Sequence, residues 1–454
     1  MKDDPSAAQA RLVIDTRGDS YELGNCLGSG GQGKVYRVKG GRLAVKLLLN
    51  ATSTRRERLR RQLQAVARLP LETLPIARPL TMLAPPHLGY VMEHVTGMVP
   101  LRRLLRAPFL GLTDWYLETG GLRRRLQLLA RVADVFAALH GQGLVYADPS
   151  PGNILVSEGV ERLEVRLIDA DNLHHDGKPF HLMFTPAYGA PELLQRRGTM
   201  STLTDAHAFG VIAFQTLALA HPLIGDAVAF ADPEVEEQAL IGKWPWIDHP
   251  SDVRNRCSFG LPSELVLSPR LKALCERTFG EGLHDPVRRA SVLEWAEHLQ
   301  AAADMTIRCP ECRGTFYVTA NRCPWCDHPR PAFVLVHFQR WEPERGTLVA
   351  STVARIVLDA SSPLVLTRRL THAASGQSAV VPTLELTLEP RGLGVRSLDK
   401  TTYLLASQRG IEREIGEPRL IMPLERFELS WRLHAGRLDY PHRCLLYTSD
   451  AADE

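Results

Sequence analysis

Residues 140–156 read HGQGLVYADPSPGNILV, and this stretch decides how the rest of the chain is interpreted. It places Asp148 and Asn153 five residues apart, directly before the apolar run 154–156, which is typical of a buried β-strand. In-line phosphoryl transfer requires a carboxylate that orients the attacking hydroxyl and an amide oxygen that holds Mg²⁺. The D-x-x-x-x-N spacing supplies both groups, so it predicts that a phosphate donor binds nearby.

A glycine-rich loop lies upstream, at residues 27–36, and reads LGSGGQGKVY. The G-x-G-x-x-G pattern alone is a weak signal, because dinucleotide-binding folds use the same spacing before a helix. Here a strand-like run follows instead, and Lys46 stands thirteen residues after Gly33. Glycines let backbone amides lie close over phosphates, and a lysine on the next strand adds a fixed positive charge. The loop and Lys46 together predict a phosphate-binding site.

Further motifs follow the central segment in order. Residues 168–171 read IDAD and begin fourteen residues after Ile154, so two further carboxylates follow the central segment. Residues 184–192 read FTPAYGAPE, Asp205 precedes an AFG triplet, and residues 285–289 read DPVRR. An ordered set of motifs at these spacings rarely arises by chance.

In this order the motifs resemble those of the protein kinase family over residues 21–300. Within that family, the IDAD run and the pattern of Phe209, Phe214 and His221-Pro222 resemble kinases of bacterial tellurite-resistance and stress clusters. The expected fold class is α+β, a bilobal protein-kinase fold with an N-lobe at 21–95 and a C-lobe at 96–303. The resemblance implies a serine/threonine-type kinase that transfers the γ-phosphate of ATP to protein hydroxyls and depends on Mg²⁺. It also implies that Arg289 pairs with Glu192.

The resemblance assigns roles to single residues as well. Asp148 and Lys46 are the implied catalytic residues, and Asn153 and Asp169 are the implied Mg²⁺ ligands. Residues 91–97 resemble the hinge whose backbone pairs with the adenine edge. The implied nucleotide-binding residues are Leu27, Gly28, Gly30, Gly33, Val35, Ala44, Lys46, Glu93, Val95 and Leu155.

Several positions depart from the kinase pattern. Tyr146 and Ala147 replace the histidine and arginine of the H-R-D motif, and Ser150 replaces a lysine that neutralises the transferred phosphoryl group. Ala170 and Asp171 replace the phenylalanine and glycine of D-F-G. These departures leave an alternative open. The chain could be a pseudokinase scaffold that binds nucleotide and recruits partners through two domains after the kinase region, a zinc ribbon at 305–330 and a β domain at 331–443.

The ion-pair partner of Lys46 is not assigned by the sequence. Kinases pair this lysine with a glutamate on the following helix, and Glu57 is the only acid between Lys46 and Glu72. Helical geometry places Glu57 on the side opposite the apolar stripe formed by Leu59, Leu63 and Val66. We therefore expect Glu57 on the solvent face of the helix.

Two C-x-x-C pairs, CPEC at 309–312 and CPWC at 323–326, have ten residues between them. Each pair can give two thiolates to one tetrahedral ion, and a short hairpin would bring the pairs together. Disulfides or free thiols are the less favoured alternatives. The sequence predicts a small zinc ribbon at 305–330, with one structural Zn²⁺, as a module independent of the kinase. The ligands are Cys309, Cys312, Cys323 and Cys326.

Alternating apolar and polar residues between Gly, Pro and Asp turns predict an all-β sandwich-like domain at 331–443. This region weakly resembles a forkhead-associated domain. Arg368, Arg369 and the turn 396–400 could form a phosphate-reading rim for a phosphoprotein partner, or could be solvated loop charges.

The chain has 454 residues, and its length predicts two to four domains. A net charge of +3 argues against nucleic-acid and acidic-membrane partners, and the paired cysteines fit a reducing cytoplasm. Residues 1–20 are expected to be a flexible arm. Residues 444–454 resemble a translated sequencing adapter, so we expect them to be an artefact and leave Cys444 out of every chemical argument.

Overall fold

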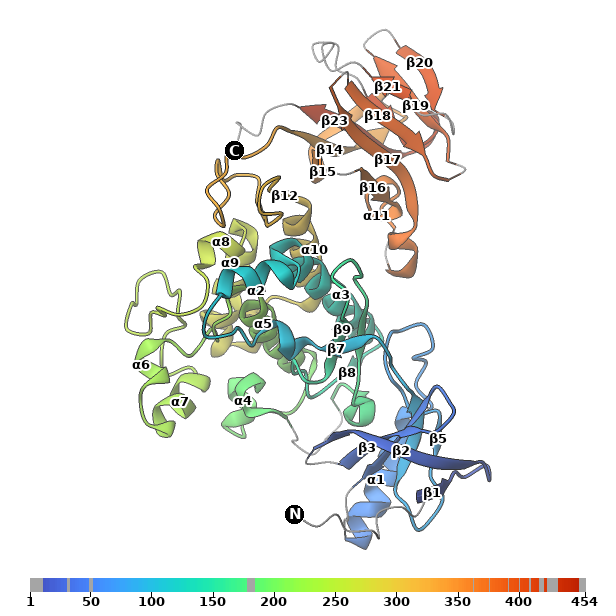
Figure 1. Ribbon diagram of the computed structural model, residues 1–454, viewed down its shortest axis with the longest axis vertical. Coiled ribbons are helices and arrows are strands. Elements are labelled where there is room, and N and C mark those ends of the chain that lie inside the picture. The colour runs from blue at the N-terminus through green and yellow to red at the C-terminus, as the bar shows by residue number, and fades with distance from the viewer. Residues whose placement is uncertain are drawn as a thin grey trace. The chain divides into compact units, whose positions relative to one another are not determined.

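The computed structural model describes most of the chain (Figure 1). The described residues are 11–30, 33–48, 52–177, 184–361, 363–374, 376–390, 392–399, 401–407, 410–415, 420–422 and 432–448. The chain divides into two compact units. The first contains Met1–Arg106, Arg131–Phe259 and Leu274–Leu293, and the second contains Ala107–Ala130, Gly260–Ala273 and Glu294–Glu454.

A six-stranded antiparallel sheet begins the first unit, in the order β1-β2-β3-β4-β6-β5. Its strands are β1 (Arg11–Ile14), β2 (Ser20–Ser29), β3 (Gly33–Val38), β4 (Leu43–Leu48), β5 (Thr81–Met82) and β6 (Gly89–Glu93). Side chains alternate along β4: Val45 packs into a cluster on one face, whereas Ala44 packs on the other face with Leu63 of helix α1 (Ser53–Val66). The same period of two places Lys46 on the Ala44 face.

The rest of the first unit is mainly helical. Helix α5 (Thr202–Ala218) begins with a capping box, in which the Ser201 side chain accepts from the Thr204 amide and Thr204 bonds back to Ser201. Its apolar sequence is buried almost throughout, as expected for a central helix. The other helices of this region are α4 (Pro191–Leu194), α6 (Asp226–Ala229) and α7 (Pro233–Leu240).

Two small antiparallel sheets carry the segments that the motifs single out. One has the order β10-β9-β7 and the other pairs β11 with β8. Their bounds are β7 (Met98–Pro100), β8 (Leu144–Val145), β9 (Ile154–Ser157), β10 (Val165–Leu167) and β11 (His174–His175). The predicted strand after Asn153 is β9, so Asp148 and Asn153 lie in the loop between β8 and β9.

The second unit begins with helix α2 (Leu112–Glu118) and the first half of helix α3 (Gly121–Gly141). It also contains α8 (Ser263–Val266) and most of α10 (Val292–Asp304), and helix α9 (Pro269–Phe279) starts in it. Apolar residues recur at helical spacing over 126–139, and this stretch lies within α3. A hairpin of β12 (Thr306–Arg308) and β13 (Thr315–Tyr317) carries the cysteine pairs.

Two antiparallel sheets follow, in the orders β15-β14-β23-β22-β19-β20 and β16-β17-β18-β21. Buried residues of both sheets share one hydrophobic cluster, so the region is a β-sandwich, as its alternating pattern predicted. The strands of the first sheet are β14 (Phe333–Glu342), β15 (Thr347–Asp359), β19 (Tyr403–Ser407), β20 (Gly410–Ile415), β22 (Arg432–His434) and β23 (His442–Thr448). Those of the second are β16 (Leu364–Thr367), β17 (Pro382–Glu389), β18 (Gly392–Ser397) and β21 (Leu420–Met422).

Strand β23 includes the first five residues of the 444–454 segment, which the sequence led us to treat as an artefact. It pairs antiparallel with β14, and Cys444 and Leu445 are buried. Leu445 belongs to the sandwich core. None of the helices in the described part of the chain is long and apolar enough to cross a membrane.

Candidate active site

Lys46 is held by two carboxylates in the interior of the first unit. Its Nζ lies 3.1 Å from Oδ1 of Asp169 and 2.6 Å from Oδ2 of Asp171, and its side chain is 3% exposed. Burial alone would lower the pKa of Lys46, but the charges of Asp171 and then Asp169 outweigh burial and raise the pKa. Lys46 is therefore a fixed cation across the ordinary pH range.

The glycine-rich loop joins β2 to β3 with little room for side chains at its end. A Cβ on Gly33 would collide with the carbonyl oxygen of Leu47, so only glycine fits there. A Cβ on Gly28 or Gly30 would meet no atom within 4 Å, so open space lies beside these two positions. Gly30 and Gly33 exchange backbone hydrogen bonds of 2.9 and 3.3 Å.

The other nucleotide-binding candidates lie on the strands around this loop. Val35 and Ala44 pack in one cluster on the Lys46 face of the sheet, whereas Leu27 on β2 is exposed. Glu93 ends β6 and pairs with Arg166, and Val95 follows it. Leu155 lies on β9 and is partly buried. The roles of these residues in nucleotide binding stay predictions.

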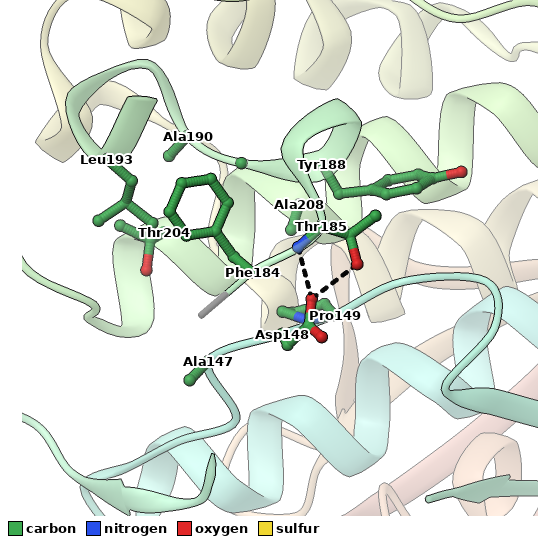
Figure 2. A pocket seen from close by; sticks show the side chains of 11 residues that line it. Ala147, Asp148, Pro149, Phe184, Thr185, Tyr188, Ala190, Leu193, Thr204 and Ala208 are labelled. Carbon is green, nitrogen blue, oxygen red and sulfur yellow. Dashed lines mark hydrogen bonds between the residues drawn. The ribbon is translucent and has the colours of Figure 1, made fainter. Parts of the chain in front are cut away.

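Asp148 is oriented by hydrogen bonds from the segment ahead of α4 (Figure 2). Its Oδ1 accepts bonds from the backbone N–H (2.8 Å) and the hydroxyl (3.0 Å) of Thr185. The Asn153 Nδ2 donates to the Asp148 carbonyl at 3.1 Å and approaches its Oδ2 at 3.4 Å. Burial raises the pKa of Asp148, and the bonds from Thr185 only partly oppose this effect. Thr185 was not among the sequence-based site residues, although it stands within the FTPAYGAPE motif.

The backbone before Asp148 is fixed by a buried acid on α5. Asp205 accepts bonds from the amides of Tyr146 (2.7 Å) and Ala147 (3.0 Å), and its Oδ2 lies 3.2 Å from Nε2 of His140. Ala147 has a φ of 79°, an unusual conformation for a residue with a Cβ. Two charged hydrogen bonds to consecutive amides offset the strain of this turn. Asp205 is therefore a positioning residue for Asp148.

Tyr146 replaces the histidine of the H-R-D motif and links the two halves of the site. Its hydroxyl donates to the carbonyl of Ile168, the residue directly before Asp169. Its ring packs edge-on against Phe136 with centroids 5.4 Å apart. This buried tyrosine ties the Asp148 loop to the Asp169 turn without a histidine.

Asn153 and Asp169 have the donor chemistry of a magnesium site. The amide of Ile168 donates to the carbonyl of Asn153 at 2.9 Å, which brings the two segments together. Asp169 has a left-handed conformation, with φ 58°, and a partly exposed carboxylate. Because the Asn153 Nδ2 faces Asp148, its amide oxygen points elsewhere. A carboxylate and an amide oxygen are ligands that Mg²⁺ accepts, so these residues fit the ion.

Glu192 and Arg289 form the expected ion pair. Two hydrogen bonds of 2.7 Å join the carboxylate to the guanidinium, and the Arg289 side chain is fully buried. Arg289 also donates to the carbonyls of Gly282 (2.7 Å) and Leu203 (3.1 Å), so its donors are satisfied by three segments.

We expect Glu192→Gln to lower the free energy of unfolding by about 2 kcal/mol, because it leaves the buried guanidinium without a counter-charge. Chemical denaturation of wild type and variant measures the difference. Glu161→Gln, at an exposed turn position, is the matched control and should have no effect. Equal stability of Glu192→Gln and wild type would contradict a stabilising role for the pair.

A second cluster of functional side chains lies in the other unit. The sulfur atoms of Cys309, Cys312, Cys323 and Cys326 all lie within 4.8 Å of one another. Two of the distances, Cys309 to Cys326 and Cys312 to Cys323, are 3.6 Å. A tetrahedral zinc with Zn–S bonds of about 2.3 Å separates its sulfurs by about 3.8 Å. The four cysteines are free of disulfides, so the set fits a closed tetrathiolate site.

This cysteine hairpin packs on the helices of its own unit. The hydroxyl of Thr315 accepts the backbone N–H of Arg123 at 2.9 Å, and so caps the start of α3. The Arg123 guanidinium donates to the hydroxyl and carbonyl of Thr306, at 2.7 and 2.6 Å. The rings of Trp325 and Tyr116 lie 5.0 Å apart. The expectation of a ribbon independent of the kinase helices is therefore wrong, because α2 and α3 contact it directly.

Comparisons with known proteins find matches over the part of the chain that contains the site. Residues 21–299 match the protein kinase domain. CBL-interacting protein kinase 4 of Oryza sativa subsp. japonica is 33% identical over 217 residues, which is 44% of this chain and 44% of the rice protein. The DNA damage-responsive serine/threonine-protein kinase RqkA of Deinococcus radiodurans is 30% identical over 46% of this chain and 31% of its own length.

A probable serine/threonine-protein kinase of Clostridium perfringens is 27% identical over 49% of this chain and 32% of the clostridial protein. The matches thus span less than half the length of these relatives. The matched domain covers more than half of the present chain and contains Lys46, Asp148, Asn153 and Asp169. The chain therefore belongs to the protein kinase family.

Proposed function

We propose that this chain is a Mg²⁺-dependent serine/threonine protein kinase that transfers the γ-phosphate of ATP to hydroxyl groups of proteins. The observation that carries the proposal is the Asp148 carboxylate, which Thr185 and Asn153 orient. The carbonyl of Asn153 accepts from the amide of Ile168, and the next residue, Asp169, pairs with Lys46. Bound ATP would supply the phosphoryl group, and its Mg²⁺ ion would neutralise the negative charge of the phosphates. Asp148 would orient the acceptor hydroxyl and take its proton, and Lys46 would hold the phosphates.

The direct test is transfer of labelled γ-phosphate from ATP to the chain itself or to a generic protein, with and without Mg²⁺. Transfer to serine or threonine that requires Mg²⁺ supports the proposal. Nucleotide binding without any transfer would favour the alternative, a pseudokinase scaffold. Two departures favour this alternative: the lost lysine charge at Ser150, which is buried, and the lost arginine at Ala147.

We expect Asp169→Ala to weaken Mg²⁺-ATP binding by at least about tenfold, since it removes the carboxylate proposed to hold the ion. Titration with a fluorescent ATP analogue, with and without Mg²⁺, measures the affinity. The matched control is Glu161→Ala, an exposed acid in the turn between β9 and β10. Unchanged affinity in Asp169→Ala would remove this residue from the metal site.

The second part of the proposal concerns zinc. We propose that Cys309, Cys312, Cys323 and Cys326 hold one structural Zn²⁺, on the grounds of their sulfur separations and the lack of disulfides. Four thiolates fill the coordination sphere, so the ion would support the fold and would not react. Reduced cysteines that bind metal are typical of cytoplasmic proteins, and this supports the proposal that the protein is located in the cytoplasm.

The third part is a phosphoprotein partner for the β-sandwich. Arg369 already pairs with Asp304 at 2.6 Å and Arg396 with Glu385 at 2.9 Å, so a phosphate would compete with carboxylates for both. Arg368 is the remaining arginine of the expected rim, and Lys400 lies outside the described residues. Binding of phosphothreonine peptides by the full chain, compared with their unphosphorylated forms, tests the idea.

A further inference from the structure

Asp171 stands where kinases carry the glycine of D-F-G, and it makes the shortest contact to Lys46. Its Oδ2 lies 2.6 Å from the lysine Nζ, whereas Asp169 lies 3.1 Å away. The Asp171 side chain is 8% exposed and that of Asp169 is 33% exposed. The more buried carboxylate is therefore also the nearer one, and electrostatic attraction is stronger where water is excluded.

Helix α1 supplies no acid to Lys46. Glu57 is the only acidic residue in Ser53–Val66, and it is exposed and pairs with Arg61 at 3.0 Å, which confirms the expectation from helical geometry. What α1 presents to the site is Gln62. Its Nε2 donates to the backbone carbonyls of Asp171 at 3.3 Å and Leu173 at 2.9 Å. The helix thus holds the backbone of the turn η3 (Ala170–Asn172), and the turn supplies the charge.

Tyr90 on β6 fixes the other oxygen of Asp171. Its hydroxyl donates to Oδ1, and the side chain is fully buried. Burial and, next, the charge of Asp171 raise the pKa of Tyr90 well above its usual value, so the hydroxyl remains a donor at ordinary pH. With one oxygen on Tyr90 and the other on Lys46, the Asp171 carboxylate has a defined orientation.

A buried lysine needs a counter-charge in every state of the site, because an unpaired charge is costly in the protein interior. Asp169 cannot be that constant partner if it binds Mg²⁺, since the ion competes for its oxygens. Asp171 would remain paired to Lys46 while Asp169 held the metal. The short D-x-D spacing would then give the two neighbouring carboxylates separate tasks.

We propose that Asp171 is the residue that positions Lys46 for nucleotide phosphates, in place of an acid on helix α1. The inference rests on the proposed function, because it assumes that Lys46 binds ATP. In this assignment the turn at 169–171 holds Lys46 through its carboxylates, and helix α1 contributes hydrogen bonds from Gln62 to the backbone of that turn. Asp171 is a positioning residue and makes no contact with substrate in this assignment.

The test is a double-mutant cycle on Mg²⁺-ATP affinity, measured with a fluorescent ATP analogue on the full chain. Asp171→Asn should weaken affinity by about tenfold, because Lys46 loses its constant partner. In a Lys46→Met background the same substitution should change affinity less than about twofold. If Asp171 only supports the fold, Asp171→Asn should lower affinity by the same factor in the wild type and in Lys46→Met. That outcome would overturn the proposal.

Two further variants keep the test decisive. Tyr90→Phe retains every charge, and it should weaken affinity by a few-fold through the lost orientation of Asp171. Asp176→Asn, an exposed acid after β11, is the matched control and should bind as wild type. Recovery of Asp171→Asn affinity at high Mg²⁺ would show that Asp171 is a metal ligand, against the proposal. The cycle measures Mg²⁺-ATP affinity and does not depend on phosphate transfer. If the wild type transferred no phosphate, the proposed kinase activity would be refuted, but the coupling between Asp171 and Lys46 could still be measured.

Discussion

Replacing Asp148 with asparagine is expected to lower phosphate transfer by about 10²- to 10⁴-fold and to leave Mg²⁺-ATP affinity unchanged. The asparagine oxygen can still accept the two bonds from Thr185, so the loop keeps its shape. It cannot take the proton of the acceptor hydroxyl. Transfer rates at saturating ATP, with the affinity of a fluorescent ATP analogue, measure the two quantities separately.

Thr185→Val is the matched variant, because it removes only the hydroxyl bond and keeps the backbone N–H bond to Asp148. It should reduce transfer far less than Asp148→Asn does. Near-wild-type transfer by Asp148→Asn would mean that another group is the base. Parallel loss of nucleotide affinity would mean that the variant has damaged the site as a whole.

The pKa of Asp148 gives this prediction a pH dependence. Burial raises that pKa above the ordinary carboxyl value of 3.8, and the base acts only when ionised. Transfer should therefore fall as pH is lowered through the raised pKa. In Thr185→Val the carboxylate loses a stabilising bond, so the fall should begin at a higher pH.

The sequence was enough to single out candidate residues for the site, but it did not indicate their contacts. Asp148, Asn153 and Asp169 follow from spacing, because a loop and a short turn fix groups that are near in sequence. The partner of Lys46 lies 125 residues away, and no local pattern reports such a contact. Asp171 was visible only as a departure from D-F-G, and the contacts that orient it come from Gln62 and Tyr90 on two other elements.

For the fold as well, the sequence predicted local elements but not the contacts between residues that are far apart in the chain. The alternating period predicted the strands of the sandwich, since it reflects one buried face. The sequence did not reveal that Arg369 and Arg396 already have carboxylate partners, because Asp304 and Glu385 belong to other elements. An arginine without a partner and an arginine paired with a distant carboxylate look alike in sequence.

The ribbon is the clearest case of a contact that spacing could not predict. Its cysteines were evident, but Thr315 caps α3, which begins at Gly121, nearly two hundred residues earlier in the chain. A Cβ on Gly121 would lie 3.2 Å from the Thr315 hydroxyl, so the close approach favours glycine at this position. Metal binding in the hairpin should therefore also stabilise the α2–α3 segment.

We expect Cys312→Ser to release the zinc ion and to unfold residues 305–330. Binding free energies of structural zinc sites are on the order of 10 kcal/mol, and so short a segment buries too little apolar surface to fold without the ion. Elemental analysis should give one Zn²⁺ per wild-type chain and much less in the variant. Limited proteolysis should cut the variant within this segment.

Hydrogen exchange decides how far the effect of Cys312→Ser extends. Amides of α2 and the first turns of α3 should exchange faster in Cys312→Ser, because Thr315 and Trp325 no longer hold Arg123 and Tyr116. Cys257→Ser, outside the cluster, is the matched control and should keep its metal and its exchange rates. If wild-type protein purified under reducing conditions contained no metal, the zinc site would be refuted. Faster exchange confined to residues 305–330 would show that the ribbon contacts the helices without stabilising them.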